Sequence, residues 1–162
     1  MKAQDNQPDG LSEKDVLAPC VKALIRGGEG KFLVLYRSAT HPRYPHDVDL
    51  PGGVVGDTGH ENEDFVAAVR REIKEETGLD IPAENCHLID TWWCEGRRQN
   101  KWQQRGLVVC DIAGTPGVKI SWEHESYAWV DFDRLVSLLK QGKHGVQVRN
   151  WRTLENYFLN KK

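Results

Sequence analysis

Runs of apolar residues, separated by short polar stretches, predict strands along most of the chain. The runs Cys20–Arg26 and Lys31–Arg37 flank the glycine-rich stretch Gly27–Gly30, which predicts a hairpin. Within the second run, Phe32–Leu35 is apolar at every position, so this strand is expected to be covered on both faces. Further strands are expected at Val48–Leu50, Cys86–Glu95, Arg105–Ile112 and Tyr127–Val130.

Helical spacing of apolar residues appears between and after these strands. Apolar positions from Phe65 to Ile73 form one stripe of a helix expected over about Asn62–Thr77. Asp131 or Asp133 could cap a second helix. Apolar residues from Val148 to Phe158 predict a third helix at the C-terminus. Because strands and helices interleave along the chain, we expect an α/β layered domain.

Composition supports a single globular domain that follows a polar arm. The 162 residues are 39% hydrophobic and 28% charged, which is enough to bury a core. Residues 1–15 are polar and contain Pro8 and Gly10, which predicts a disordered N-terminal arm. Residues 16–162 are then expected to form one domain.

Charge and cysteine usage exclude several classes of partner. A net charge of −2 gives no indication of a nucleic-acid-binding surface. No apolar run approaches the length of a membrane span, so no membrane partner is expected. The four cysteines form no Cys-x-x-Cys pair, and Cys20 and Cys110 are expected to be buried small hydrophobic residues. This pattern fits a cytoplasmic location.

Three glutamates crowd the end of the first predicted helix. Glu72, Glu75 and Glu76 lie on nearly one face, and Gly78 is a good residue to end the helix. Acidic side chains are disfavoured at the negative end of a helix dipole and repel one another at this spacing. A bound hard cation such as Mg²⁺ would relieve both effects, so the cluster predicts a functional site.

The segment Arg71–Leu79, preceded by Leu50-Pro51-Gly52-Gly53, resembles the Nudix hydrolase signature. That signature is Gly-x5-Glu-x7-Arg-Glu-U-x-Glu-Glu-x-Gly-U, where U is aliphatic, and its second half matches this chain without a gap. Glu63 fits the upstream glutamate, and Gly53 is the counterpart of the first glycine. Nine residues separate these two where the pattern has five, so the loop Val54–Asn62 is four residues longer than the family pattern.

The resemblance implies both a fold and an activity. The fold would be the Nudix-type α/β/α sandwich around a mixed β-sheet, covering roughly Leu17–Phe158. The activity would be metal-dependent hydrolysis of a diphosphate linkage in a nucleoside diphosphate derivative or a nucleoside triphosphate. The cofactor would be Mg²⁺ or Mn²⁺, and the partner a small-molecule nucleotide. Many family members dimerise, so a homodimer is an open expectation, and the signature does not specify the substrate.

Roles for individual residues follow from the same match. Glu72 and Glu76 would be the principal metal ligands, and Glu75 a third ligand or the general base. Gly53 would offer its backbone carbonyl to the metal. Arg71 would orient a carboxylate through a salt bridge, although an ordinary surface arginine is the alternative. Glu63, or Glu61 in its place, could brace the loop against the helix.

A second acidic segment resembles the Glu-His-x-x-Tyr-x-Trp stretch that precedes the last strand in many Nudix proteins. Glu123 holds the matched position and would approach the metals as a general base, with Glu125 as the alternative. A solvated turn explains these acids equally well. His124 is expected to be structural.

Aromatic and basic residues supply candidates for substrate binding. Trp93 could stack on a base, and Arg97 or Arg98 could hold phosphate. Arg37, near the glycine-rich loop, is a further phosphate candidate, as are Arg43 and His46. For Trp93, Arg97 and Arg98, the plainer interpretation is a charged hairpin tip with tryptophans packed on the sheet.

Two other functions compete with hydrolysis. The isopentenyl diphosphate isomerase branch of the fold needs a reactive cysteine, and Cys94 is the candidate, without a supporting pattern. The second alternative is a non-catalytic nucleotide sensor. The intact acidic face of the first predicted helix argues against it, because a pure binder has less need of these glutamates. Release of phosphate from a nucleotide panel would separate the hydrolase from both.

Overall fold

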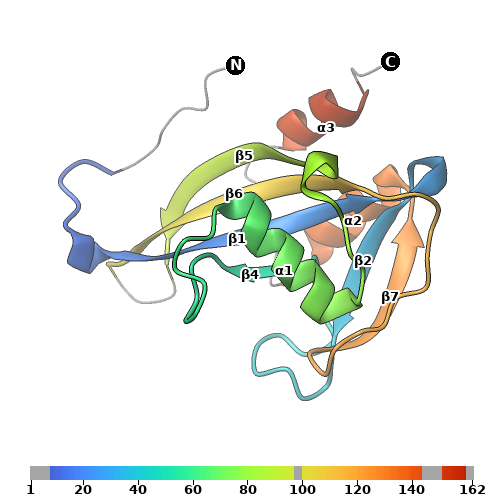
Figure 1. Ribbon diagram of the computed structural model, residues 1–162, viewed down its shortest axis with the longest axis horizontal. Coiled ribbons are helices and arrows are strands. Elements are labelled where there is room, and N and C mark those ends of the chain that lie inside the picture. The colour runs from blue at the N-terminus through green and yellow to red at the C-terminus, as the bar shows by residue number, and fades with distance from the viewer. Residues whose placement is uncertain (1–7, 97–99, 144–150, 160–162) are drawn as a thin grey trace.

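A twisted mixed sheet forms the centre of the protein (Figure 1). The computed structural model describes residues 8–96, 100–143 and 151–159. Within these ranges the strands are β1 (Val16–Arg26), β2 (Phe32–Arg37), β3 (Val48–Asp49), β4 (Gly52–Val54), β5 (Cys86–Glu95), β6 (Trp102–Asp111) and β7 (His124–Val130). The main order is β3-β2-β1-β6-β5, while β4 pairs with β1 and β7 with β2. β1 and β6 are parallel, and the other pairs are antiparallel.

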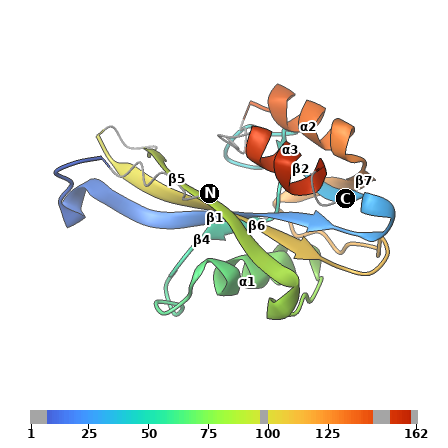
Figure 2. The ribbon, with the colours of Figure 1, turned by 90° about the horizontal axis from the view of Figure 1, so that it is seen from above.

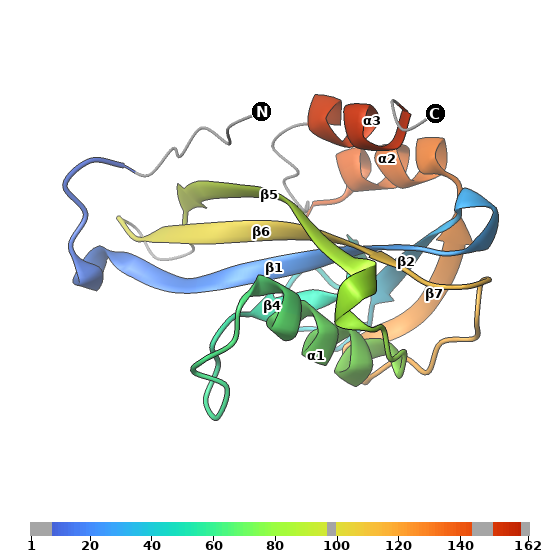
Figure 3. The ribbon, with the colours of Figure 1, turned by 45° about the horizontal axis from the view of Figure 1, so that its top comes forward.

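Helices cover the two faces of this sheet (Figures 2 and 3). α1 (Phe65–Thr77) lies on one face, and α2 (Phe132–Gln141) and α3 (Trp151–Leu159) lie on the other. Short 3-10 turns occur at η1 (Glu13–Asp15), η2 (Gly28–Gly30) and η3 (Ala83–Asn85). The expected α/β/α sandwich is therefore confirmed. No helix in the described part of the chain is long and apolar enough to cross a membrane.

The core has two halves because successive side chains of a strand point to opposite faces. In β1, Ala23 and Ile25 pack with α1, whereas Leu24 packs with α2 and α3. β2 repeats the alternation and is buried on both faces from Phe32 to Leu35, as its apolar run predicted. Phe32, Phe132 and Phe158 make edge and tilted ring contacts between the sheet and the two helices.

Most of the expected elements form, with shifted ends and one addition. α1 begins at Phe65 rather than Asn62, because Asp64 caps it by accepting a hydrogen bond from the Ala67 N–H at 2.7 Å. Asp131 is the residue that caps α2. The three-residue strand β4 was not expected, since Gly52 and Gly53 carry no strand signal of their own. Val148 lies outside the described residues.

Two expectations concern the N-terminal part of the chain. Residues 1–7 of the predicted arm lie outside the described residues, and residues 13–15 form η1, closed by hydrogen bonds between Ser12 and Asp15. The expectation for Cys20 is wrong: it is only partly buried, because the register of β1 leaves it facing a cavity. Cys110 is buried as expected.

Candidate active site

The end of α1 places two carboxylates of the acidic cluster against the sheet. Gly78 ends the helix in the left-handed conformation, with φ of 71°. Glu76, in the last turn, is only 6% exposed, whereas the Glu75 side chain is 57% exposed. Glu72 lies one turn earlier and faces the same direction as Glu76.

The strand β4 passes directly over these two carboxylates. The Gly52 backbone N–H donates to Glu76 Oε2 at 3.1 Å. A Cβ atom built on Gly53 would lie 2.7 Å from Glu72 Cδ, so a side chain at this position would displace the Glu72 carboxylate. Pairing of β4 with β1 fixes the position of both glycines, opposite Lys22 and Val21 respectively. The structure thus brings Gly53 next to Glu72, which supports its alignment with the first glycine of the signature.

Arg71 connects the longer loop to the acidic cluster. Its guanidinium donates to both carboxylate oxygens of Glu63, at 2.7 and 3.0 Å, and to Glu72 Oε1 at 2.8 Å. It also reaches the Val54 carbonyl at 3.1 Å and Glu75 Oε2 at 3.5 Å. The Arg71 fork holds the pKa of Glu63 below its usual range. Arg71 and Glu63 therefore occupy bracing positions, and the extra loop residues do not disturb this contact.

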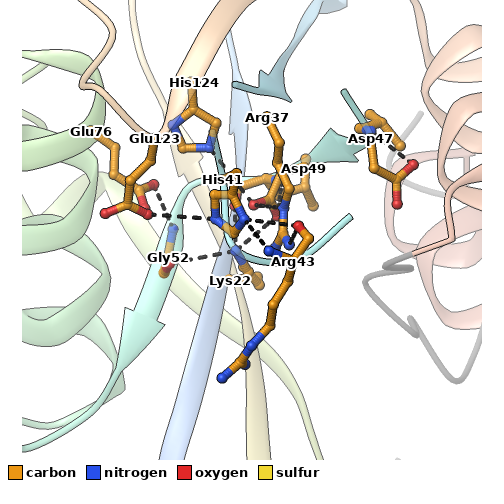
Figure 4. Close-up of polar contacts among 12 residues, drawn as sticks. Lys22, Arg37, His41, Arg43, Asp47, Asp49, Gly52, Glu76, Glu123 and His124 are labelled. Atoms are coloured by element: carbon orange, nitrogen blue, oxygen red, sulfur yellow. Dashed lines mark hydrogen bonds and ion pairs between the residues drawn. The ribbon is translucent and has the colours of Figure 1, made fainter. Parts of the chain in front are cut away.

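A buried ionic network lies beside the cluster and was missed in the sequence (Figure 4). Asp49 accepts from Lys22 Nζ at 2.8 Å and from Arg37 Nε at 3.0 Å, and only 5% of its side chain is exposed. His124 Nε2 lies 3.7 Å from the same carboxylate, too far for a hydrogen bond. The polar positions of Lys22 in an apolar strand and of Asp49 between Val48 and Leu50 were the available signals.

Electrostatics in this region are set by burial and by the two cations. Burial raises the pKa of the Glu76 carboxyl to about 8, although the Lys22 ammonium opposes the shift. Burial likewise raises the pKa of Glu72, against the effect of Arg71. Burial would also raise the pKa of Asp49, but the charges of Lys22 and Arg37 hold it below its usual range. A cation bound beside Glu76 would oppose this effect of burial and favour the charged carboxylate.

A cavity of about 360 Å³ adjoins this network. Its walls come from the six strands β1 to β6, the loop after β2, the end of α1 and the segment before β7. The lining residues are Cys20, Val21, Lys22, Arg37, His41, Pro42, Arg43, Asp49, Gly52, Gly53, Val54, Glu76, Trp92, Gln103, Arg105, Gly106 and Glu123. The cavity therefore extends from Glu76, in the acidic cluster, to residues of β5 and β6.

The two glutamates of the second acidic segment lie in different places. Glu123 lines the cavity, and its Oε2 lies 3.9 Å from His41 Nε2 (Figure 4). Glu125 instead bonds His46 Nδ1 at 2.7 Å and does not line this cavity. The structure therefore places Glu123, and not Glu125, at the wall of the cavity.

Substrate-binding candidates from the sequence are only partly brought to the cavity. Arg37 lines it but is 4% exposed and is engaged by Asp49 and by the Arg43 carbonyl. Trp93 does not line it, whereas Trp92 does, because neighbouring residues of β5 face opposite sides of the sheet. Arg97 and Arg98 lie outside the described residues.

The oxygen ligands at the acidic cluster fit a hard divalent cation whose remaining ligands come from substrate and water. Among the described residues, no group of three or more His, Cys, Asp or Glu side chains is arranged to hold a metal. Mg²⁺ usually takes one or two protein carboxylates and completes its shell with water and substrate phosphates. Glu72 and Glu76, with the adjacent Gly53 backbone, offer such a partial set of oxygen ligands.

Comparisons with known proteins agree on the family. The model of the NUDIX domain matches residues 16–151. No curated relative matches the chain. A MutT protein from Methanosarcina mazei Go1 is 29% identical, with a TM-score of 0.59 over 78% of this chain and 85% of that protein.

Two more distant structures share the fold. The C. elegans Ap4A hydrolase is 20% identical, with a TM-score of 0.64 over 89% of this chain and 99% of that protein. The E. coli dihydroneopterin triphosphate pyrophosphohydrolase is 21% identical, with a TM-score of 0.63 over 90% and 96%. The signature residues gathered beneath β4 and the match of the family model across most of the chain lead to one conclusion: the protein belongs to the Nudix hydrolase family.

Proposed function

We propose that this protein uses Mg²⁺ or Mn²⁺ to hydrolyse a diphosphate linkage in a nucleoside diphosphate derivative or a nucleoside triphosphate. The observation that carries the proposal is the position of Glu76 and the Gly52–Gly53 strand at the wall of the cavity. A substrate in this cavity would bring its phosphate oxygens to the acidic cluster, where they could share a cation with the glutamates.

Glu72, Glu76 and the Gly53 carbonyl would hold the metal in this proposal. Members of the family generally use divalent metal ions. A bound cation would neutralise the diphosphate and lower the pKa of an attacking water. Arg71 would keep the Glu72 carboxylate in place, since it donates to that side chain and to Glu63 at the same time. Glu75 could add a third ligand from its exposed position.

Glu123 is the preferred acceptor for the proton of the attacking water. It lines the cavity from the segment before β7, which is joined to the end of α1 because the Ser121 N–H donates to the Glu76 carbonyl at 3.1 Å. The nearest cationic candidate is His41, whose Nε2 lies 3.9 Å from Glu123 Oε2, beyond hydrogen-bond distance. Glu75 is a candidate because it belongs to the same cluster as the proposed metal ligands. It ranks second because it does not line the cavity.

The proposed substrate class is nucleotides, and the proposed setting is a reducing cytoplasm. Relatives of similar fold act on Ap4A and on dihydroneopterin triphosphate, both of which contain linked phosphates. All four cysteines are free, which is compatible with a reducing compartment. A homodimer and the division into an arm (1–15) and one domain (16–162) remain predictions.

A nucleotide panel with Mg²⁺ and with Mn²⁺ tests the proposal. Products should contain a nucleoside monophosphate, together with pyrophosphate or a phosphorylated remainder, and EDTA should stop their formation. Binding of nucleotides without any hydrolysis would instead identify a sensor. The isomerase alternative has little support, because Cys94 does not line the cavity and its Sγ donates to the Gln103 carbonyl at 3.6 Å.

A further inference from the structure

We propose that Arg105 and Gln103 recognise the lactam edge of a nucleobase, meaning a ring carbonyl next to a ring N–H. This inference rests on the proposed function in one respect, that the ligand is a nucleotide. It goes further by assigning the part of the cavity that lies away from the acidic cluster, and by naming the base chemistry that this part would accept.

Arg105 sits in a row of residues that crosses four strands. The register of the sheet aligns Val54 of β4 with Cys20 of β1, Cys20 with Arg105 of β6, and Arg105 with Trp92 of β5. All four residues line the cavity. At about 4.8 Å between neighbouring strands, Arg105 lies roughly 10 Å from β4 and its glycines. A group bound by Arg105 would therefore be separated from phosphates bound beside Gly53.

Within the described part of the chain, the Arg105 Nε lacks the kind of partner that two other cations at the cavity, Lys22 and Arg37, have. This nitrogen is shielded from solvent and, among the described residues, has no hydrogen-bond partner. Lys22 and Arg37, by contrast, share the Asp49 carboxylate. A shielded donor without an acceptor is unfavourable, so Arg105 would gain from a ligand that brings an acceptor to its guanidinium where the side chain lines the cavity.

Gln103 supplies the complementary acceptor on the same face of β6. Its Nε2 is already committed, since it donates to the Ala18 carbonyl at 2.8 Å and to Cys20 Sγ at 3.0 Å. These contacts fix the orientation of the amide and leave Oε1 to accept a hydrogen bond. Gln103 and Arg105 are two residues apart, so their side chains point to the same side of the strand.

The resulting pattern is a donor next to an acceptor, beside the aromatic wall formed by Trp92. A lactam edge presents the complementary arrangement, with its carbonyl toward Arg105 and its N–H toward Gln103. Hypoxanthine, guanine and uracil have this edge. Adenine and cytosine present an amino group and an unprotonated ring nitrogen in these two places, so both contacts would be lost in the orientation that seats a lactam edge with its phosphate beside Gly53.

Equilibrium binding of nucleoside monophosphates tests the inference, because these ligands need no hydrolysis. IMP and AMP differ only at the edge in question, and UMP and CMP form the matched pyrimidine pair. Isothermal titration should show a preference for the lactam member of at least one pair by roughly tenfold. Arg105→Met should bring that ratio close to one. Arg105→Lys, which keeps the charge but loses the planar fork, should reduce it.

Gln104→Met is the matched control, since Gln104 is adjacent on β6 but does not line the cavity. It should leave the ratio unchanged, and melting temperatures should verify that each variant is folded. Equal affinities within both pairs for the wild type, or a ratio that survives Arg105→Met, would overturn the inference. If Arg105→Met lowered the affinity for all four ligands by the same factor, the inference would also be overturned, since that result indicates a phosphate contact. Lactam selectivity in a protein that hydrolyses no nucleotide would sustain the inference while rejecting the proposed function.

Discussion

Gly52 and Glu76, 24 residues apart in the chain, are joined by a hydrogen bond of 3.1 Å from the glycine N–H to a carboxylate oxygen. This contact links the last turn of α1 to the strand β4 and so to the central sheet. It places a buried acidic side chain at the wall of the cavity rather than in solvent. The neighbouring Gly53 can then lie directly against Glu72.

Asp49 is expected to be the most important residue of the ionic network for stability. Asp49→Asn would leave Lys22 and Arg37 without the charge they share, and losing one partner of a buried pair costs about 3–5 kcal/mol. Urea denaturation measures the change in the free energy of unfolding. Asp111→Asn is the control, since its pair with Arg26 is partly exposed and should be worth about 0.2–1 kcal/mol. Equal effects of the two substitutions would contradict this role.

The two glutamates before β7 should differ in their effect on catalysis. Glu123→Gln should lower kcat by about 10²–10⁴-fold if Glu123 is the general base, because Gln cannot accept the proton. Glu125→Gln should have little effect, since Glu125 contacts His46 away from the cavity. Steady-state kinetics of the two variants on one substrate decide between them. If Glu125→Gln is the more impaired, the assignment is wrong; if neither is impaired, Glu75 becomes the candidate.

A divalent metal should stabilise the folded protein even without substrate. A ligand that binds only the native state adds about 1.4 kcal/mol at ten times its Kd, which corresponds to a rise in Tm of roughly 2–4 °C for a domain of this size. Glu72→Gln/Glu76→Gln should abolish the rise, because both charged ligands are lost. Thermal scans with EDTA and with several millimolar Mg²⁺ measure it. A wild-type Tm that is the same in EDTA and in Mg²⁺ would count against a cation site.

Much of the catalytic region could be predicted because its signals are local. The cap at Gly78 and the spacing of Glu72, Glu75 and Glu76 depend only on helix geometry, and the structure reproduces them. Residues joined through the sheet were harder to find. Asp49 gains its importance from Lys22, 27 residues away, and that pairing depends on strand register.

The choice between Trp92 and Trp93 shows the same limit. Two adjacent aromatic residues in a strand face opposite sides, and the sequence alone does not tell which side holds the cavity. β5 has an irregularity between Leu88 and Asp90, which shifts the alternation that the preceding residues suggest. Arg105 escaped attention for a related reason, since its neighbours across the sheet come from β1 and β5.

Turnover of Glu76→Gln on a nucleotide that the wild type cleaves tests the central claim most directly. The substitution keeps the size of the side chain but removes the charge proposed to hold the metal. Losing about 3 kcal/mol of metal-assisted stabilisation would slow hydrolysis by roughly 100-fold. Glu84→Gln, at an exposed site in η3, is the control and should retain full activity. The account predicts that Glu76→Gln is folded and nearly inactive at saturating Mg²⁺. Wild-type turnover by Glu76→Gln under those conditions would contradict it.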